Sequence, residues 1–254
     1  METGKKAFVT GGSRGIGRGI IRMLSEAGYD VAFTYSSEKE MAETLRVEVS
    51  AGGRRCFYYQ ASLENADVPE AITQKAIDDL GGIDLLVCNA GMTKFNSLLT
   101  TEGEFIDYLY SLNYRSYILC AKTAAKSMVA EGTRGNIIFI ASTRGFRAYP
   151  EDCIYGSLKA AVIRGTESMA LEMAAHGIRV NCVAPGATAV RGDFSPGELS
   201  KPPLASLIPL GRLGSPDEVG RLVRFIASDE AGYMTGNTIK LDGGLILPGT
   251  PESF

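Results

Sequence analysis

VTGGSRGIGRGI, residues 9–20, is the stretch that decides the fold of this chain. It follows an apolar run over 6–10 that predicts a β-strand, and it leads into an amphipathic pattern over 15–27 that predicts a helix. Its glycines, spaced GxxxGxG, allow a tight turn and a close backbone approach to a ligand, and the helix N-terminus favours an anion. A glycine-rich turn between a first strand and a helix is typical of a dinucleotide-binding loop.

The rest of the chain repeats this alternation of strand and helix. Predicted strands cover 6–10, 29–35, 55–60, 83–88, 135–141, 178–184 and 237–241, and predicted helices cover 15–27, 38–51, 68–80, 103–131, 152–175 and 216–228. The strands are apolar on both faces, which predicts a buried parallel sheet with helices on either side. We therefore expect one α/β domain over 1–254, a three-layer α/β/α sandwich with a doubly wound sheet of roughly seven strands.

A Pro- and Gly-rich segment interrupts the alternation at about 187–214. A long irregular stretch inside a compact domain is usually functional or mobile. Its apolar side chains suit a substrate lid, and the alternative is a surface insertion.

Composition excludes several classes of function. The chain has 254 residues, 45% hydrophobic and 22% charged, and a net charge of −3, with no dense basic stretch that would favour nucleic acid. No apolar run approaches the roughly 20 residues of a membrane span. Five scattered cysteines and a single histidine argue against a metal site. The opening METGKKAFVTGG lacks the pattern of a secretory signal, so we expect a cytoplasmic protein.

The end of the second predicted strand, FTYSSEKE, bears on the choice of dinucleotide. Folds of this kind hold the ribose of NAD with an acidic residue there, whereas a basic or hydroxyl pocket accepts the phosphate of NADP. The expected position is Tyr35 or Ser36, and Arg14 of the glycine loop offers a guanidinium. This pattern favours NADP(H). Glu38 and Glu40 lie close by and leave a ribose contact open, and Arg14 as a solvated loop charge is the alternative.

The stretch IYGSLK places Tyr155 and Lys159 four residues apart on a predicted helix, and therefore on one face of it. A phenol with a pKa of about 10 is a poor proton donor and acceptor at neutral pH. A neighbouring ammonium and a positive nicotinamide would both lower that pKa. The alternative is an ordinary pair on a solvated surface.

Further motifs occur in order along almost the whole chain. They are TGGSRGIG, CNAG, IAS, YGSLK, RVNCVAPG, IPLGRLGSPDEV and TGNTIKLDGG. With them the chain resembles the short-chain dehydrogenases/reductases, and within that family the 3-oxoacyl-(acyl-carrier-protein) reductases and glucose 1-dehydrogenase-like members. The resemblance implies a Rossmann-like fold, a homotetramer formed through the helices 103–131 and 152–175, and no metal.

The resemblance also implies a catalytic set of Asn113, Ser142, Tyr155 and Lys159. In this reading Tyr155 is the general acid in reduction and the general base in oxidation. Lys159 lowers the pKa of Tyr155 and binds the nicotinamide ribose. Ser142 orients the substrate oxygen, and Asn113 positions a water that relays protons to Lys159.

The cofactor contacts implied by the resemblance follow the strand ends. They are Gly11, Ser13, Arg14, Gly15, Ile16, Gly17, Ser36, Ser62, Leu63, Asn89, Ala90, Gly91, Tyr155, Lys159, Pro185, Gly186 and Thr188. This chain departs from the family where Ser62 replaces an Asp against the adenine, where Cys88 replaces the first Asn of NNAG, and where Val190 replaces a threonine. The contact with the nicotinamide carboxamide is then expected to shift from position 190 to Thr188.

The substrate pocket is expected at Phe95, Arg144 and Tyr149, between the fourth strand and Tyr155. An arginine there suits a carboxylate, a phosphate or a carrier-linked thioester, and a surface arginine at a subunit contact is the alternative. The sequence thus predicts an NADP(H)-dependent oxidoreductase that acts on a small carbonyl or secondary alcohol: a 3-oxoacyl thioester, ketone, steroid or sugar. A nucleotide-bound sensor or scaffold without turnover, and a dehydratase or epimerase on the same fold, are the alternatives.

Overall fold

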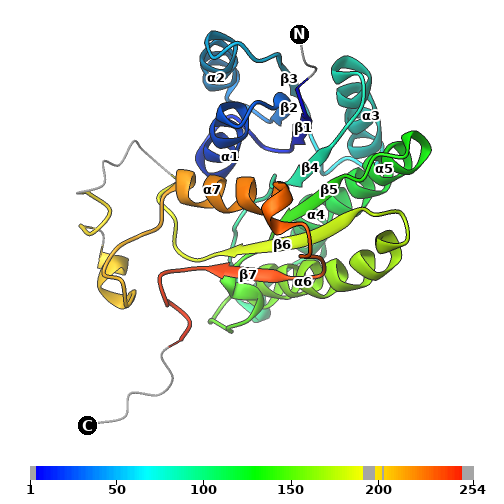
Figure 1. The fold of residues 1–254 in the computed structure, drawn as a ribbon. Helices are drawn as coiled ribbons and strands as arrows, with labels where there is room; N and C mark the ends of the chain where they lie inside the picture. Colours follow the sequence, from blue (N-terminus) through cyan, green and yellow to red (C-terminus); the bar gives the residue numbers. More distant parts are fainter. Residues whose placement is uncertain (1–3, 191–197, 202, 248–254) are drawn as a thin grey trace.

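The computed structural model describes residues 4–190, 198–201 and 203–247. Within these ranges, seven parallel strands form one sheet in the order β3-β2-β1-β4-β5-β6-β7 (Figure 1). The strands are β1 (Lys6–Val9), β2 (Asp30–Tyr35), β3 (Cys56–Gln60), β4 (Leu85–Cys88), β5 (Asn136–Ile140), β6 (Arg179–Pro185) and β7 (Thr238–Leu241). Each overlaps a predicted strand, and only β6 extends past its predicted range, by one residue, so the predicted fold class is confirmed.

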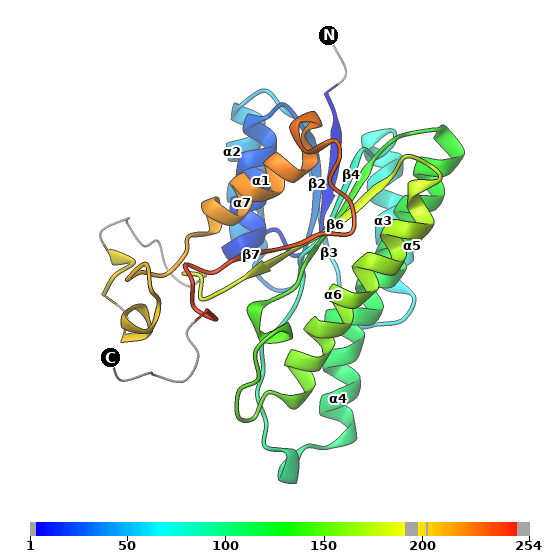
Figure 2. The same ribbon diagram turned by 60° about the horizontal axis from the view of Figure 1, so that its bottom comes forward.

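Helices cover both faces of the sheet, as Figure 2 shows. One face carries α1 (Gly15–Glu26), α2 (Lys39–Ala51) and α7 (Pro216–Ala227), and the other carries α3 (Val68–Leu80), α4 (Gly103–Tyr110), α5 (Ser116–Glu131) and α6 (Cys153–Ala174). Within the described ranges, none of these helices combines the length and apolar character needed to cross a bilayer.

The continuous apolar character of the strands follows from burial on both faces. In β1, Phe8 points into the hydrophobic core beneath α3 and α5, whereas Ala7 and Val9 point into the core beneath α1 and α7. All three side chains are fully buried. Alternate residues of each central strand thus serve two separate cores.

The strand order reverses at β1. The chain runs outward from β1 to β2 and β3, then returns to place β4 on the other side of β1. In an open parallel sheet, the crevice beside such a reversal, at the carboxyl ends of the strands, is where ligands bind. The glycine loop after β1 and the CNAG segment after β4 meet there.

The predicted helix 103–131 differs from the structure in one respect. It is divided into α4 and α5 by a π-helical turn at Ser111–Arg115, with Asn113 at its centre. A π-turn leaves one extra residue in the helix and is frequent at functional sites. Periodicity alone does not reveal it, because the apolar face resumes after the turn.

The predicted lid over 187–214 lies partly outside the described residues, since it includes 191–197 and 202. The described part has a small core of its own, formed by Ala189, Leu199, Ile208 and Leu213. Its function as a lid stays a prediction.

Candidate active site

The glycine loop is tied to the neighbouring strand before it enters α1. Gly11 has φ +70°, and its amide donates to Thr34 Oγ1 at 2.9 Å. A Cβ on Gly17 would lie 2.0 Å from the carbonyl oxygen of Gly11, so only glycine fits at this crossing. Arg14 at the N-cap of α1 makes no side-chain capping bond. Within the described residues, no side chain caps the first amides of α1, and such amides at a helix N-terminus suit an anion.

The segment after β4 is joined to the same loop. Asn89 Nδ2 donates to the carbonyls of Thr10 and Gly11 at 3.0 and 2.8 Å. The hydroxyl oxygen of Thr10 accepts from the amides of Asn89 and Ala90 at 2.9 and 3.0 Å. The predicted Asn89 thus holds the loop as well as lining the crevice. The sequence analysis missed Thr10 and Thr34, although a hydroxyl at the end of each strand was the available signal.

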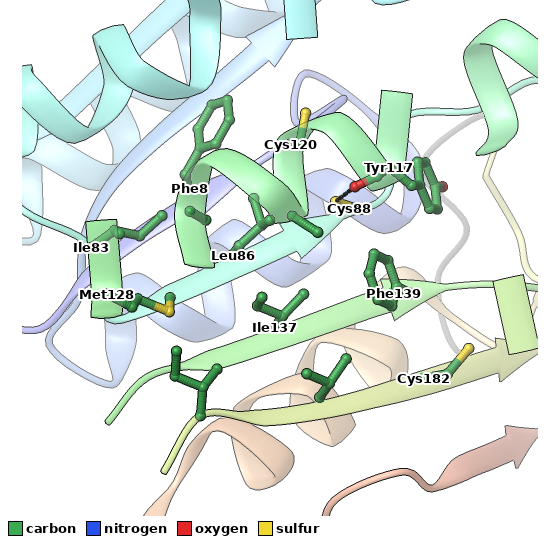
Figure 3. Packing of buried hydrophobic residues seen from close by; sticks show 14 of the residues in the cluster. Phe8, Ile83, Leu86, Cys88, Tyr117, Cys120, Met128, Ile137, Phe139 and Cys182 are labelled. Carbon is green, nitrogen blue, oxygen red and sulfur yellow. Dashed lines mark hydrogen bonds between the residues drawn. The ribbon is translucent and has the colours of Figure 1, made fainter. Parts of the chain in front are cut away.

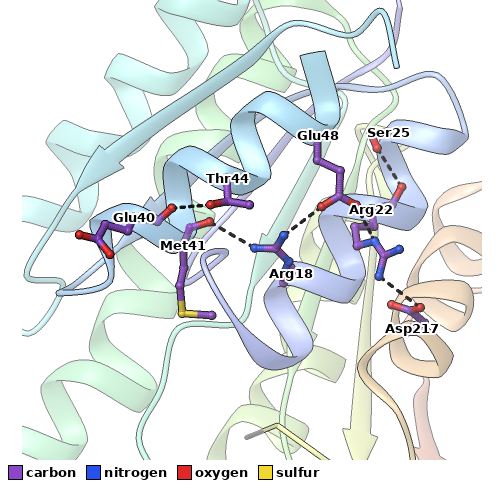
Figure 4. A network of polar contacts seen from close by, with 8 residues as sticks. All are labelled: Arg18, Arg22, Ser25, Glu40, Met41, Thr44, Glu48 and Asp217. Atoms are coloured by element: carbon purple, nitrogen blue, oxygen red, sulfur yellow. Dashed lines mark hydrogen bonds and ion pairs between the residues drawn. The ribbon is translucent and has the colours of Figure 1, made fainter. Parts of the chain in front are cut away.

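A cavity of about 650 Å³ lies beside the loop, lined by arginines of α1 and by Met41 and Thr44 of α2. Figure 4 shows that two of these arginines are already paired. Arg18 and Arg22 lie 2.9 and 2.8 Å from the Glu48 carboxylate. Arg14 also lines the cavity, and within the described part of the chain it has no carboxylate partner.

The predicted adenine-side residues follow β2 and β3. Ser36 is exposed, and its carbonyl accepts from Gln60 Nε2 at 2.9 Å, which fixes the turn after β2. Ser62 is exposed beside it, whereas the Leu63 side chain is buried. A contact from Leu63 to an adenine would therefore come from its backbone.

The predicted nicotinamide-side residues lie at the end of β6. The Gly186 amide donates to the Leu241 carbonyl of β7 at 2.9 Å. Thr188 Oγ1 donates to the Gly186 carbonyl at 3.3 Å, which closes the turn after Pro185. Pro185, Gly186 and Thr188 thus sit at the same edge of the sheet as the glycine loop.

Tyr155 lies in the first turns of α6, with its side chain 8% exposed. Burial raises the pKa of Tyr155, and hydrogen bonds with Thr93 and Ser142 partly offset this. Ser142 follows β5 and also accepts from the Arg144 amide at 3.2 Å. The structure thus brings the predicted Tyr155 and Ser142 together and adds the hydroxyl of Thr93, from the segment after β4.

Lys159 lies one helical turn further along α6 and is buried. Its Nζ donates to the Ile140 carbonyl at 3.0 Å and lies 5.7 Å from the centre of the Tyr155 ring. Burial lowers the pKa of Lys159 to about 8. The expected net lowering of the Tyr155 pKa is not found in this structure, because burial of the phenol outweighs its favourable contacts.

Asn113 is fully buried in the π-turn, where its side chain binds the backbone of the segment after β4. Its Oδ1 accepts from the Met92 amide at 3.2 Å, and its Nδ2 donates to the carbonyls of Met92 and Leu109 at 3.3 and 3.2 Å. A Cβ on Gly91 would lie 2.6 Å from Asn113 Oδ1. Asn113 therefore fixes the wall of the crevice, and its predicted role in positioning a water stays a prediction.

The predicted pocket residues form a stack around Arg144. Its guanidinium lies 4.2 Å from the centre of the Phe95 ring and 4.4 Å from that of Tyr149, and it pairs with Asp152 at 2.9 Å. Phe95 in turn meets the Tyr155 ring edge to face at 6.4 Å. Arg144 was considered as an anion-binding residue, but its charge is engaged by Asp152. The sequence analysis missed that partner.

Within the described ranges, no group of three or more His, Cys, Asp or Glu side chains is arranged to hold a metal ion. The cysteines of that part of the chain are free thiols.

Comparison with known proteins agrees with this geometry. A family model described as enoyl-(acyl carrier protein) reductase matches residues 11–246. The 3-oxoacyl-(acyl-carrier-protein) reductase of Staphylococcus aureus is 37% identical over 247 residues, which is 97% of this chain and 100% of that protein.

Solved structures agree over the same length. An acetoin dehydrogenase from Salmonella typhimurium superimposes with a TM-score of 0.94 at 30% identity, covering 98% of this chain and 99% of that one. A blue fluorescent protein from a metagenomic library, solved with NADPH, gives a TM-score of 0.87 at 32% identity, covering 96% and 98%. The ordered motifs, the fold and these matches together show that the chain belongs to the short-chain dehydrogenase/reductase family.

Proposed function

We propose that this chain is an NADP(H)-dependent oxidoreductase that transfers a hydride between the nicotinamide and a neutral carbonyl or secondary alcohol. The observation that carries the proposal is the convergence of Tyr155, Ser142 and Lys159 on the edge of the sheet that also holds the glycine loop. A proton donor, an oxygen-orienting hydroxyl and a buried cation beside a dinucleotide crevice suit carbonyl reduction.

The residues present fit a dinucleotide. The crossing of Gly17 over Gly11 and the N-terminus of α1 suit a pyrophosphate, and Pro185 and Gly186, at the end of β6, would contact the nicotinamide. Arg14 lines the arginine-lined cavity and has no carboxylate partner among the described residues, which supports a preference for NADP(H) over NAD(H). When bound, the nicotinamide supplies or accepts the hydride, and its oxidised form adds a positive charge that favours the Tyr155 phenolate.

Side chains of the protein transfer the proton to and from the substrate oxygen. In reduction, the Tyr155 hydroxyl gives its proton to the carbonyl oxygen, which becomes the alcohol, and in oxidation the phenolate takes it back. Ser142 hydrogen-bonds the same substrate oxygen and fixes its direction. The Lys159 ammonium stabilises the negative charge that Tyr155 carries after it has given up the proton.

The stack around Arg144 narrows the substrate class. A guanidinium that is paired with a carboxylate and covered by two rings has little capacity left for a substrate anion. Phe95 instead offers an exposed apolar surface beside Tyr155. Neutral ketones and hydroxyketones, the class to which acetoin belongs, and 3-oxoacyl thioesters suit this wall better than free acids.

The test is a panel of substrates followed by the loss of reduced-nicotinamide absorbance, with NADPH and NADH in parallel. Diacetyl, acetoin, acetoacetyl thioesters, steroids and sugars make up the panel, and pyruvate and acetoacetate serve as anionic controls. We expect turnover with neutral carbonyls and a preference for NADPH. Binding of NADPH without turnover on any member would favour the sensor or scaffold instead.

We also expect a homotetramer in the cytoplasm. Exposed Val129 on α5 and Leu171 on α6 leave apolar surface on two long neighbouring helices, which suits a subunit contact. Light scattering on the purified protein gives the number of subunits directly.

A further inference from the structure

The ammonium of Lys159 is buried without a carboxylate. Within the described ranges, no acidic side chain lies within ion-pair distance of its Nζ, and the residue is 3% exposed. An ammonium has three N–H donors, and burying it is unfavourable unless acceptors replace water. The Ile140 carbonyl at 3.0 Å is one such acceptor.

The second acceptor is a phenol on another helix. Tyr117 of α5 places its hydroxyl oxygen 3.4 Å from Lys159 Nζ, and the centre of its ring lies 5.0 Å from the same atom. The Tyr117 hydroxyl donates in turn to the Ile140 carbonyl at 3.3 Å. Lys159, Tyr117 and the Ile140 carbonyl therefore form a closed triangle of hydrogen bonds.

Tyr117 is held firmly in this position. Its side chain is 1% exposed and stacks on Phe139 of β5, with ring centres 6.0 Å apart and planes inclined by 12°. Its carbonyl accepts from the Cys88 thiol at 3.8 Å, the contact drawn in Figure 3. A phenylalanine would fill the same space without burying a hydroxyl, so packing alone does not account for a tyrosine here.

The groups that face Lys159 come from every element packed around it. They are Tyr117 from α5, Tyr155 from α6, the Cys88 thiol from β4, the Cys182 thiol from β6 and the Ile140 carbonyl from β5. Burial raises the pKa of Tyr117 far above its usual range, so this residue is a neutral phenol that both donates and accepts. It is not a second source of protons.

We propose that Tyr117 is a positioning residue of the reaction, whose ring and hydroxyl keep the buried Lys159 ammonium charged and directed toward Tyr155. The proposal rests on the proposed function, in which the Lys159 charge supports the Tyr155 phenolate. It assigns a task to a side chain that is fully buried in the core beneath the crevice.

The test is Tyr117→Phe, which removes only the hydroxyl, with Tyr29→Phe as the matched control. Tyr29 is also a buried tyrosine, but it directly precedes β2 and so lies at the amino ends of the strands, away from the crevice at their carboxyl ends. The titration of Lys159 is followed by NMR of isotope-labelled lysine in the protein without substrate, with the signal assigned by its loss in Lys159→Arg. We expect Tyr117→Phe to lower the midpoint by about one pH unit, because a charge-assisted hydrogen bond is lost.

The pH profile of kcat for carbonyl reduction is the second readout. A midpoint lowered from about 8 to about 7 reduces the protonated fraction about twofold at pH 7 and about fivefold at pH 8. The loss should therefore grow toward alkaline pH, whereas damage to folding alone would lower kcat equally at each pH. Tyr29→Phe should leave both the midpoint and the profile unchanged.

The outcomes separate the two proposals. Turnover with an unmoved Lys159 midpoint in Tyr117→Phe overturns the role of Tyr117 alone. A moved midpoint in a protein that reduces no carbonyl supports the Tyr117–Lys159 coupling and overturns the proposed function. If Tyr117→Phe does not fold, 3-fluorotyrosine placed at 117 keeps the shape and the hydroxyl but accepts more weakly, and the midpoint should then fall by a smaller amount.

Discussion

The two halves of the sheet build their parts of the crevice differently. On the β1–β3 side, the binding surface is mostly backbone: the glycine turn, the first amides of α1 and the carbonyls held by Asn89. On the β4–β6 side, the surface is formed by buried polar side chains held by main-chain carbonyls and by one another. Changes on the first side should therefore alter cofactor binding, and changes on the second side should alter the chemical step.

The largest effect is expected from Tyr155→Phe, on the β4–β6 side of the crevice. If Tyr155 is the proton donor, as proposed, its loss should lower kcat by roughly 10²- to 10⁴-fold, the usual contribution of general acid catalysis. The dissociation constant for NADPH, measured by fluorescence titration, should stay within about twofold, since little of the binding surface is removed. A variant that keeps half of its kcat would contradict the assignment.

Gly17→Ala tests cofactor binding on the β1–β3 side of the crevice. Its methyl group would lie 2.0 Å from the Gly11 carbonyl oxygen, so the loop and α1 must separate. Loss of one charge-assisted hydrogen bond to the pyrophosphate is worth about 1.5–3 kcal/mol, so NADPH should bind roughly 10- to 100-fold more weakly. Gly103→Ala is the control, because its added Cβ meets nothing within 4 Å. Unchanged NADPH affinity in Gly17→Ala, with a normal melting temperature, would argue against a dinucleotide at this loop.

Arg14→Gln, also on the β1–β3 side, tests whether the protein prefers NADPH to NADH. A charge-assisted contact to a phosphate is worth about 1.5–3 kcal/mol, which is roughly 10- to 100-fold in the dissociation constant for NADPH. Binding of NADH should change little. Arg18→Gln is the matched control, since Arg18 lines the same cavity but is paired with Glu48. Equal losses of affinity for NADPH and NADH would contradict a preference for NADP(H) based on Arg14.

The pH dependence of the chemical step tests whether reduction requires the positive charge of Lys159, on the β4–β6 side. Its folded pKa of about 8 lies below the ordinary 10.5, so the ammonium is charged below pH 8 and is lost above it. We expect kcat for reduction to fall about tenfold for each pH unit well above 8, while NADPH binding through the glycine loop changes less. A kcat that is flat to pH 10 would contradict the charge requirement.

The same depressed pKa has a consequence for stability. The folded protein disfavours the protonated form, so Lys159 lowers the stability below pH 8, and this penalty shrinks as the pH rises from 8 toward 10.5. Lys159→Met should therefore raise the melting temperature at pH 7 while it abolishes turnover. A lower melting temperature would mean that the hydrogen bonds of the ammonium outweigh its burial.

The smallest effect is expected outside both halves, at the start of α7. Ser215 and Glu218 form a capping box, and Arg212 lies 2.6 Å from the Glu218 carboxylate. The pKa of Glu218 is lowered from 4.5 to about 2, chiefly by its hydrogen bond with Arg212, so its contribution is present above pH 4.5 and is lost as the pH falls toward 2. Glu218→Gln should cost about 1 kcal/mol at pH 7, measured by urea unfolding, and much less near pH 2, with kcat unchanged. An equal cost at both pH values would exclude the charge as the cause.

The two halves also differ in how well the sequence predicts them. The glycine loop and the strands could be predicted from the sequence, because glycine requirements and apolar runs are local properties of the chain. The π-turn at Asn113 was not, because it depends on how α4 and α5 pack around the segment after β4. Thr93 follows β4 and Tyr155 lies on α6, so no spacing rule joins these partners. Asp152 lies eight residues after Arg144 in one irregular connection, whose fold back on itself periodicity does not give. The sign of the Tyr155 pKa shift depended on the extent of burial, which only the packed structure gives.

Isotope transfer shows whether this protein moves a hydride from the nicotinamide to a carbonyl carbon. The wild-type protein is incubated with NADPH carrying deuterium at both C4 positions and with the best ketone of the panel, and the product is examined by mass spectrometry and NMR. We expect one deuterium atom on the new carbinol carbon of each product molecule, and none at that carbon when unlabelled NADPH is used in deuterium oxide. A product whose carbinol hydrogen comes from solvent, or a dehydrated or epimerised product formed without consumption of NADPH, would contradict it.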